Sequence, residues 1–405
     1  MTDLPRRDLH PHEFVVFVAA LIAVNALGVD LMLPALADIG RDLAVATANH
    51  RQWIITVYMG GFGAGQLVYG PLADRFGRRP VLLLTLAGVT AASVFAAASA
   101  TFPALLVARA LQGLMSASTR VLAVAIVRDR QSGRRMARTM SLAQMIFFLV
   151  PILAPSIGQV LLGSGSWRFI FYALAAFDAL VLAWTAWRLP ESLPRARRQP
   201  LSFAALATAY RLTLGNRFSL GYAIASALTF GGIIGFVSVS QQVFVDEFGV
   251  GRRFTWLFAV CAAAMGCAAF ANSRLVERLG TRAISQAAVF ALIALSLARL
   301  GVIATGHETL AVFLLFQATS MACIGLCGSN FGAMAMEPVG HIAGTASSVQ
   351  GFISTVGAVA VGSLIGQSYH GTTVTLATGY LCIGVAVLGV VLWVERGRLF
   401  HARMA

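Results

Sequence analysis

The stretch GPLADRFGRRP, residues 70–80, decides how the rest of this chain is interpreted. It carries one acid and three arginines within the six residues from Asp74 to Arg79, whereas the flanking segments 52–73 and 80–108 contain no Asp, Glu, Lys or Arg. Charges confined to a short segment between two long apolar segments are typical of a loop that joins membrane-spanning helices.

The composition of the whole chain supports a membrane environment. Of the 405 residues, 58% are hydrophobic and only 11% are charged, against about 25% charged residues in a soluble domain. The net charge of +14 does not indicate a nucleic-acid partner, because the arginines that produce it lie in clusters between apolar runs. The five cysteines lie inside apolar runs with no His or carboxylate beside them, so we expect no metal site and no disulfide framework.

Apolar segments long enough to cross a bilayer follow one another along the chain. A transmembrane helix needs about 20 mostly apolar residues, and we place twelve such segments, at 14–36, 52–73, 80–100, 103–127, 139–162, 168–189, 218–243, 255–274, 283–305, 309–333, 343–366 and 374–394. A Pro- and Arg-rich segment lies midway. We therefore predict an all-α integral membrane protein with twelve transmembrane helices in two six-helix halves, 1–189 and 218–405, joined by a cytoplasmic central loop at 190–217.

The arginines predict the orientation of the chain in the membrane. They cluster after the second, fourth, sixth and eighth segments and in the C-terminal tail, and none follows the third, ninth or eleventh segment. Cytoplasmic loops of membrane proteins carry an excess of Lys and Arg. We therefore predict that both the N-terminus and the C-terminus lie in the cytoplasm.

The charged loop occurs twice. Residues 74–79 read Asp-Arg-Phe-Gly-Arg-Arg, and residues 277–282, 203 positions later, read Glu-Arg-Leu-Gly-Thr-Arg. Both copies follow the second apolar segment of their half and share the pattern acid-Arg-apolar-Gly-x-Arg. A pattern repeated at the same place in each half indicates two parallel repeats, related by an axis along the membrane normal.

Several segments of the chain resemble those of a known family. Residues 70–80 resemble the signature loop of major facilitator transporters, and RALQGLMSASTRVLAVAIVRD at 109–129 resembles the fourth-span motif of their drug/proton antiporter branch. VPILAPSIG at 150–158 partly matches the fifth-span antiporter motif, through Pro151, Pro155 and Gly158, although Gln159 replaces its usual second glycine. The segments VDLMLPAL, SWRFIF, LPESL and MEPVGHIAGTASSVQGFISTVG resemble the Bcr/CflA group, the bicyclomycin- and chloramphenicol-resistance type.

We interpret the charged loop as a latch that holds the cytoplasmic side closed. Gly70 and Gly77 would permit a tight backbone, and Asp74 would lie at a helix N-terminus of the other half, where an anion is favoured by about 0.3–1 kcal/mol. The resemblance implies that this is the eleventh helix. The latch residues are Gly70, Asp74, Arg75, Gly77, Arg78, Arg79 and their acidic partner Asp129, with Glu277, Arg278 and Gly280 in the second copy. The alternative is a positive loop that only fixes the orientation.

Two acids, Asp30 and Asp178, lie well inside the predicted spans. Ionisable residues are costly there and mark functional sites. At 1.5 Å per residue Asp30 lies about 24 Å along the first span, and Arg109 lies about 9 Å below the outer edge of the fourth. Their depths are similar, so they could pair or share a water-filled cavity. For Asp178, a functional role, an interhelical hydrogen bond and a silent protonated side chain all stay open.

A polar stripe runs along the fourth span. Arg109, Gln112, Ser116 and Arg120 are spaced by 3, 4 and 4 residues and therefore share one helix face. Such a face must look into protein or water, not lipid. Arg120 lies near the inner interface, where it either joins the stripe or reaches out of the membrane. On the first span, Asn25 offers a hydrogen bond either to the cavity or to a neighbouring helix.

These residues predict antiport by competition. Burial favours the protonated form of Asp30 and the Arg109 charge favours the ionised form, so a proton and a cationic substrate can displace each other. We therefore predict a proton-coupled antiporter that exports small apolar or cationic drugs across a bacterial inner membrane by alternating access. We expect a monomer whose partners are a small-molecule substrate, protons and the lipid bilayer, with no nucleic acid and no cofactor.

Two other functions compete with this prediction. One is a major facilitator exporter or importer of a specific metabolite, such as a sugar, an amino acid or a siderophore, since a stripe with two arginines suits an anionic or zwitterionic substrate. The other is an integral-membrane enzyme or sensor. The sequence contains no metal-spaced His, Cys or acid cluster and no phosphate-binding glycine loop followed by Lys, so we predict that the protein is not an enzyme.

Overall fold

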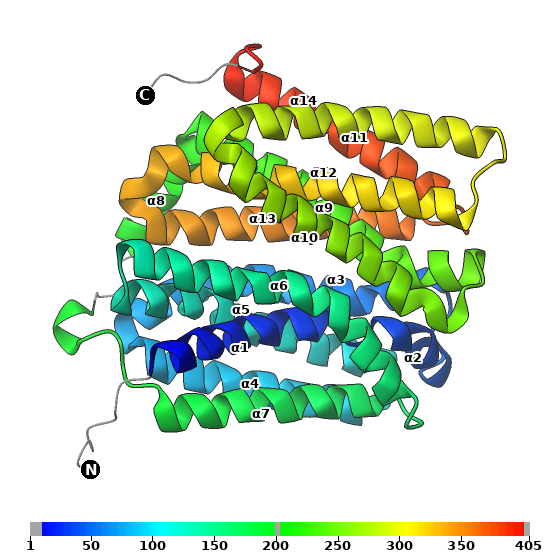
Figure 1. The fold of residues 1–405 in the computed structure, drawn as a ribbon. Helices are drawn as coiled ribbons and strands as arrows, with labels where there is room; N and C mark the ends of the chain where they lie inside the picture. The colour runs from blue at the N-terminus through cyan, green and yellow to red at the C-terminus, as the bar shows by residue number, and fades with distance from the viewer. Residues whose placement is uncertain (1–9, 199–202, 401–405) are drawn as a thin grey trace. The chain divides into compact units, whose positions relative to one another are not determined.

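The computed structural model describes residues 10–198 and 203–400, and these form helices without any strand. Twelve of the described helices have at least 20 residues, and Figure 1 shows them as long rods joined by short connections. Within the described residues, ten helical segments are long and apolar enough to cross a membrane. The prediction of an all-α integral membrane fold is therefore confirmed.

Two of the predicted spans are not among these ten segments. The helix over 53–76 has glycine, glutamine and tyrosine in its middle, and the helix over 133–162 begins with arginines, with Leu149–Leu162 as its described apolar part. Glycine and polar residues lower the mean hydropathy of a window without preventing a helix whose polar side chains face other helices.

The chain divides into two compact units, which we describe separately. Unit 1 is Met1–Ala46 with Trp53–Phe203, and unit 2 is Thr47–Gln52 with Ala204–Ala405. The helices of unit 1 are α1 (Pro11–Asp30), η1 (Leu33–Ala35), α2 (Leu36–Asp42), α3 (Trp53–Phe76), α4 (Arg78–Ala98), α5 (Phe102–Arg130), α6 (Gly133–Leu162), α7 (Arg168–Arg188) and η3 (Arg195–Arg197). The other helices are η2 (Asn49–Gln52), α8 (Phe203–Gly215), α9 (Arg217–Gln241), η4 (Gln242–Glu247), η5 (Gly251–Arg253), α10 (Phe254–Leu279), α11 (Thr281–Ala304), α12 (Leu310–Met336), η6 (Glu337–Ile342), α13 (Ala343–Gln367) and α14 (Val374–Glu395).

The segment predicted as a central loop, 190–217, contains structure of its own. It includes η3 and most of its second part is α8, while residues 199–202 lie outside the described part of the chain. A run of Ala, Leu and Thr over 203–213 is compatible with a helix, which the high proline and arginine content of the preceding residues obscures.

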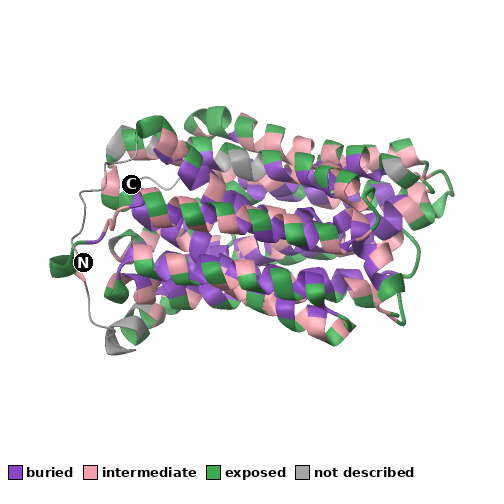
Figure 2. Ribbon diagram, turned by 90° about the horizontal axis from the view of Figure 1, so that it is seen from below, coloured by how far each residue is buried: buried purple, intermediate pink, exposed green. Residues whose placement is uncertain are grey.

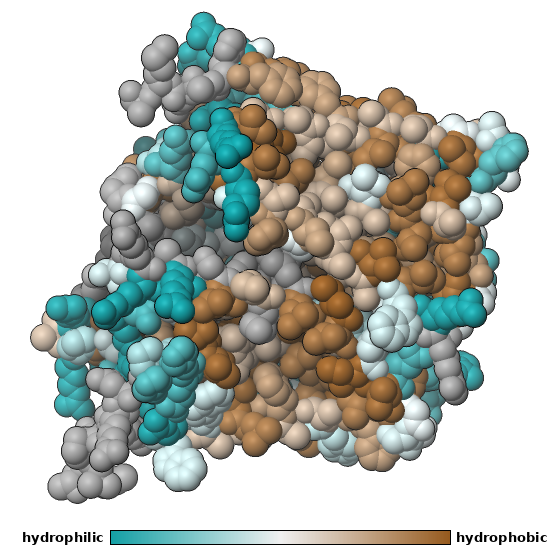
Figure 3. Space-filling view, in the orientation of Figure 1, coloured by the Kyte–Doolittle hydropathy of each residue, from teal (hydrophilic) through white to brown (hydrophobic). Residues whose placement is uncertain are grey.

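The exterior of the helices is apolar. Large hydrophobic side chains such as Leu84, Val160 and Leu180 are more than two-thirds exposed, and Figure 3 shows hydrophobic residues over the flanks of the helices and hydrophilic residues near their ends. A surface of this kind suits lipid and not water. The buried residues, purple in Figure 2, lie on the faces that the helices turn to one another.

Close helix packing in unit 1 depends on a glycine of α5. A Cβ atom added at Gly113 would collide with the backbone carbonyl of Tyr58 on α3. Small residues at such positions let the backbones of membrane helices approach closely. The close approach of α3 and α5 brings Tyr58 next to the polar stripe of α5.

Gly113→Ala is therefore expected to destabilise the protein by about 1–3 kcal/mol, the usual cost of overpacking. The measurement is the thermal unfolding midpoint of the purified protein in detergent. Gly60→Ala is the matched control, because the same added atom meets nothing within 4 Å there and alanine favours a helix over glycine. Equal midpoints for the two variants would contradict the packing argument.

Candidate functional site

A cluster of buried polar side chains occupies the interior of unit 1. Five helices contribute to it: α1, α3, α4, α5 and α7. Each member is less than 10% exposed, and they are Asn25, Asp30, Tyr58, Ser93, Arg109, Gln112, Ser116 and Asp178. Six of these residues were predicted as site residues or as intramembrane acids, whereas Tyr58 and Ser93 were not.

Arg109 is held by backbone carbonyls and by Gln112. Its Nη2 donates to the carbonyl oxygen of Gly28 at 2.8 Å, its Nε to that of Ile54 at 3.3 Å, and its Nη1 to Gln112 Oε1 at 2.5 Å. The guanidinium also lies over the Tyr58 ring, 4.2 Å from the ring centroid. Gly28 is in the last turn of α1, where carbonyls lack partners within the helix and the helix dipole favours a cation.

The structure does not show the ion pair between Asp30 and Arg109 that the sequence suggested. Asp30 is the last residue of α1 and is buried, and among the described residues no ion pair or hydrogen bond engages its carboxyl. The carbonyls at the end of α1 take the guanidinium instead. Arg109 nevertheless reaches the end of α1, because it donates to the carbonyl oxygen of Gly28, two residues before Asp30.

A chain of hydrogen bonds leads from Arg109 to Asp178. Gln112, which accepts from Arg109, donates through Nε2 to Ser93 Oγ on α4 at 2.7 Å. Ser93 in turn donates to Asp178 Oδ2 on α7 at 2.9 Å. Of the roles that the sequence left open for Asp178, the structure therefore contains the interhelical hydrogen bond.

The rest of the polar stripe divides into buried and exposed positions. Ser116 Oγ lies 3.0 Å from the Tyr58 hydroxyl, and Asn25 Nδ2 donates to that hydroxyl at 3.3 Å. Asn25 therefore contacts a neighbouring helix. Arg120 differs from the rest of the stripe, because its side chain is exposed; it lies eleven residues, or about 16 Å, beyond Arg109 along α5.

The antiporter-motif residues lie on α6. Pro151 and Pro155 are inside this helix, and Gly158 is buried near its end. A Cβ atom at Gly158 would collide with the carbonyl oxygen of Leu31, the residue that follows Asp30. Gly158 therefore permits α6 to approach the end of α1 at the position of the buried acid.

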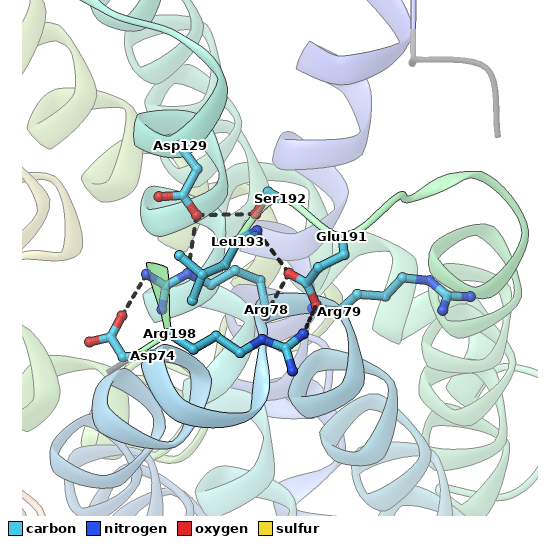
Figure 4. A network of polar contacts seen from close by, with 8 residues as sticks. All are labelled: Asp74, Arg78, Arg79, Asp129, Glu191, Ser192, Leu193 and Arg198. Atoms are coloured by element: carbon cyan, nitrogen blue, oxygen red, sulfur yellow. Dashed lines mark hydrogen bonds and ion pairs between the residues drawn. The ribbon is translucent and has the colours of Figure 1, made fainter. Parts of the chain in front are cut away.

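The charged loop forms a network at one end of unit 1 (Figure 4). Arg78 is 4% exposed and bridges two acids, through Nη2 to Asp74 at 2.6 Å and through Nε to Asp129 at 3.1 Å. Asp129 is the partner that the sequence suggested for these arginines. Asp74, expected at a helix N-terminus of the other half, has Arg78 as its partner within unit 1.

Only one of the two loop glycines makes a turn. Gly77 has a φ of 102° between α3 and α4, a backbone conformation that favours glycine. The expectation of a tight backbone at Gly70 is wrong, because α3 continues through Gly70 and Pro71 to Phe76. Of the neighbouring arginines, Arg75 lies over the ring of Phe76 and Arg79 donates to the carbonyl oxygen of Ala186.

Sequence reasoning assigned no role to Glu191, which completes this network. Its two carboxylate oxygens accept from the backbone N–H groups of Arg78 at 2.9 Å and Arg79 at 3.4 Å. Those are the first residues of α4, whose N–H groups have no partner within the helix. The negative charge also favours a helix N-terminus. The acid inside the segment LPESL was the signal that could have revealed it.

Glu191→Gln is therefore expected to lower the free energy of unfolding by about 1 kcal/mol, from the loss of a charge at a helix N-terminus. Chemical or thermal unfolding of the purified protein measures this change. Glu277→Gln, at the exposed acid of the second loop copy, serves as the control and should leave the unfolding midpoint unchanged. If both variants unfold alike, Glu191 does not stabilise α4.

The second copy of the loop has a similar turn with different contacts. Gly280 has a φ of 79° between α10 and α11, while Glu277 and Arg278 are exposed. Arg282 is the paired cation of this copy, since its Nε lies 2.8 Å from Glu395 and its Nη2 3.3 Å from Glu337.

Unit 2 also contains a buried cation that sequence reasoning missed. Arg299 of α11 is 2% exposed; its Nε pairs with Glu308 at 2.9 Å and its Nη1 donates to Gln317 at 3.4 Å. Gln317 donates in turn to the Tyr380 hydroxyl at 2.7 Å. An arginine near the end of the otherwise apolar run 283–305 was the available signal.

Buried ionisable side chains inside a membrane-spanning helical bundle mark a pathway for ions or substrates. The fold and the interior of unit 1 therefore define the class of this protein as a multi-pass membrane transporter.

Comparison with known proteins identifies the family. A model of the Major Facilitator Superfamily matches residues 18–362, and the chain belongs to this family, as its motifs predicted. It is 30% identical over 383 residues to a bicyclomycin resistance protein homolog of Haemophilus influenzae, covering 93% of this chain and 94% of the relative. It is 30% identical over 253 residues to the multidrug resistance protein MdtL of Klebsiella pneumoniae, covering 62% of this chain and 63% of the relative.

The solved structures agree on the fold. The crystal structure of a D-xylose-proton symporter covers 97% of this chain and 99% of the symporter with a TM-score of 0.74, at 13% sequence identity. At this identity the likeness supports the major facilitator fold alone.

Proposed function

We propose that this protein is a proton-coupled antiporter that exports small apolar or cationic drugs across a bacterial inner membrane, with both termini in the cytoplasm. Relatives named for bicyclomycin resistance and multidrug resistance support the substrate class. The observation that carries the proposal is Asp30, a buried carboxyl in the first spanning segment that no described residue engages by hydrogen bond or ion pair.

Asp30 would couple the two fluxes because one carboxyl cannot serve both at once. Its ionised form attracts a cationic substrate, and its protonated form does not. A proton taken up from the outside would release the substrate, and a substrate bound from the cytoplasm would displace the proton. Arg109, Gln112, Ser116 and Asn25 would form the surrounding polar surface, and Arg120 would lie toward the cytoplasmic end.

The loop network would act as the latch on the cytoplasmic side. In this proposal the bridge from Asp74 through Arg78 to Asp129, together with Glu191 on the first turn of α4, holds the ends of α3, α4 and α5 in one arrangement. Opening to the cytoplasm would require the loop to change its contacts. Glu277, Arg278 and Gly280 would contribute less, because the two charged side chains are exposed.

Transport into everted membrane vesicles tests the function. Vesicles that contain the overproduced protein are given a proton gradient and a panel of fluorescent dyes and antibiotics. Accumulation of panel compounds against their gradient, lost on addition of an uncoupler, is expected. No gradient-dependent transport of any panel compound, together with transport of a labelled sugar, amino acid or siderophore, would overturn the proposal in favour of a metabolite transporter.

A further inference from the structure

Asp178 lies in the middle of a spanning helix and belongs to a hydrogen-bond chain that the proposed exchange at Asp30 does not use. It is ten residues from either end of α7, or about 15 Å, and it is 2% exposed. Three helices supply the chain: Arg109 and Gln112 come from α5, Ser93 from α4 and Asp178 from α7. The guanidinium of Arg109 also donates to the carbonyl oxygens of Ile54 on α3 and Gly28 on α1, and these bonds fix the position of the first group in the chain.

The direction of every bond in this chain follows from its first member. A guanidinium has donors and no acceptor, so Gln112 must turn its oxygen to Arg109 and its amide nitrogen away. Ser93 must then accept from that nitrogen, and its own hydrogen is donated to Asp178 Oδ2. Asp178, the last group, accepts. The relay of Gln112 and Ser93 therefore points donors from a cation toward a carboxyl, and hydrogen bonds of this direction favour the ionised carboxylate.

The charges of the interior can be counted. In the described part of unit 1, the charged side chains that are buried within spanning segments away from the loop network are Asp30, Arg109 and Asp178. One cation faces two acids. A buried charge without compensation is costly, so this set is neutral when one acid is ionised and the other holds a proton.

We propose that Asp178 is the ionised counter-charge of Arg109, joined to it by the Gln112–Ser93 relay, and that it acts as a positioning residue which keeps the exchangeable proton on Asp30. With Arg109 neutralised through the relay, Asp30 has no cation to favour its ionised form, so it retains a proton until a substrate charge arrives. The inference builds on the proposed exchange at Asp30 and assigns the control of its proton affinity to a residue on a different helix.

Other charged groups around these acids lie elsewhere along the helices or are already paired. The helices packed against α7 are α4, α1 and α6, and those against α1 are α6, α5 and α7. Near the two acids, α5 presents Arg109 and the neighbouring α3 presents the Tyr58 hydroxyl. The remaining charged side chains described on these helices lie in the first turns or toward the C-terminal ends: His12, Glu13, Arg78, Arg79, Arg120, Arg128, Asp129, Arg130, Arg135, Arg138, Arg168 and Arg188.

Infrared spectroscopy of the purified full chain in lipid nanodiscs tests the inference without any transport step. The C=O band of a protonated carboxyl is followed as the pH is raised, and Asp30→Asn identifies the contribution of Asp30. In Asp178→Asn the Asp30 band should be lost at a pH about one unit lower than in the wild type, a tenfold weaker proton affinity, because Arg109 is no longer neutralised. Ser93→Ala should shift the band in the same direction by less.

Two control variants separate the relay from general packing. Ser93→Thr keeps the hydroxyl and should restore the wild-type titration. Ser118→Ala removes a buried serine that bonds to Thr85, outside the relay, and should leave the titration unchanged. The inference is overturned if the Asp178→Asn titration is unshifted or moves to higher pH, if Asp178→Asn itself removes the band, or if the band persists in Asp30→Asn. Drug export does not enter these measurements, so a failure here is distinct from a failure of the proposed function.

Discussion

Asp30→Asn is expected to abolish proton-driven export while the protein still folds and inserts. An amide has the shape of the carboxyl but cannot exchange a proton, and none of the described residues relies on Asp30 for an ion pair. The measurement is accumulation of a transported dye in everted vesicles with and without a proton gradient. Gradient-driven accumulation should fall to the level of vesicles without the protein, whereas movement of the dye down its own gradient should persist.

Asp38→Asn is the matched control for this variant. Asp38 lies in α2, eight residues further along the same segment, where it pairs with Arg41 on a partly exposed surface. Exposed pairs of this kind contribute about 0–1 kcal/mol, so export should be normal. Uphill export by Asp30→Asn at a normal expression level would rule Asp30 out as the coupling residue.

Arg109→Lys is expected to be the most damaging conservative substitution in unit 1. The planar guanidinium satisfies three acceptors in different directions and lies over the Tyr58 ring, whereas one ammonium group cannot reach all of them. Leaving a buried carbonyl without a partner costs about 1–3 kcal/mol. The variant should therefore lose about 3 kcal/mol of stability and most of its export.

Arg41→Lys tests whether the effect belongs to the site. The Arg41 side chain is 80% exposed and, among the described residues, pairs with Asp38 alone, so the same exchange of residue types should change neither the unfolding midpoint nor export. A stable and active Arg109→Lys protein would show that the positive charge alone matters. The hydrogen bond from Arg109 to the carbonyl oxygen of Gly28 at the end of α1 would then not be needed.

The helices were predictable from the sequence because apolar length and arginine clusters mark their middles and ends. The turn at Gly77 between α3 and α4 follows directly from the charged stretch. The three buried residues of the polar stripe on α5, Arg109, Gln112 and Ser116, also followed from helical spacing. The same spacing failed at Arg120, which is exposed, since periodicity specifies a face of the helix and not how much of that face the neighbouring helices cover.

The contacts of the site were not predictable in the same way. Arg109 donates to the carbonyl oxygen of Gly28. Every residue has such a backbone carbonyl, so the sequence does not indicate which one accepts the hydrogen bond. The relay from Gln112 through Ser93 to Asp178 crosses three helices. The spacing of residues along one helix does not show how that helix is rotated relative to its neighbours, so the contacts between them could not be predicted. Glu191 was overlooked for a similar reason, because it is distant in sequence from the helix whose first turn it satisfies.

The two turn glycines, at 77 and 280, differ in how well they would tolerate substitution. Both combine a positive φ with an extended ψ, 154° at Gly77 and 157° at Gly280, a backbone region that essentially only glycine adopts without strain. At Gly280 nothing lies within 4 Å of an added Cβ atom, whereas at Gly77 that atom would collide with the carboxylate of Glu191. A substitution at 280 therefore carries backbone strain alone, whereas at 77 it adds the collision with Glu191, so random mutagenesis with selection for export should recover more substitutions at 280 than at 77. The two halves of a duplicated chain can thus drift apart at equivalent positions while keeping the same backbone.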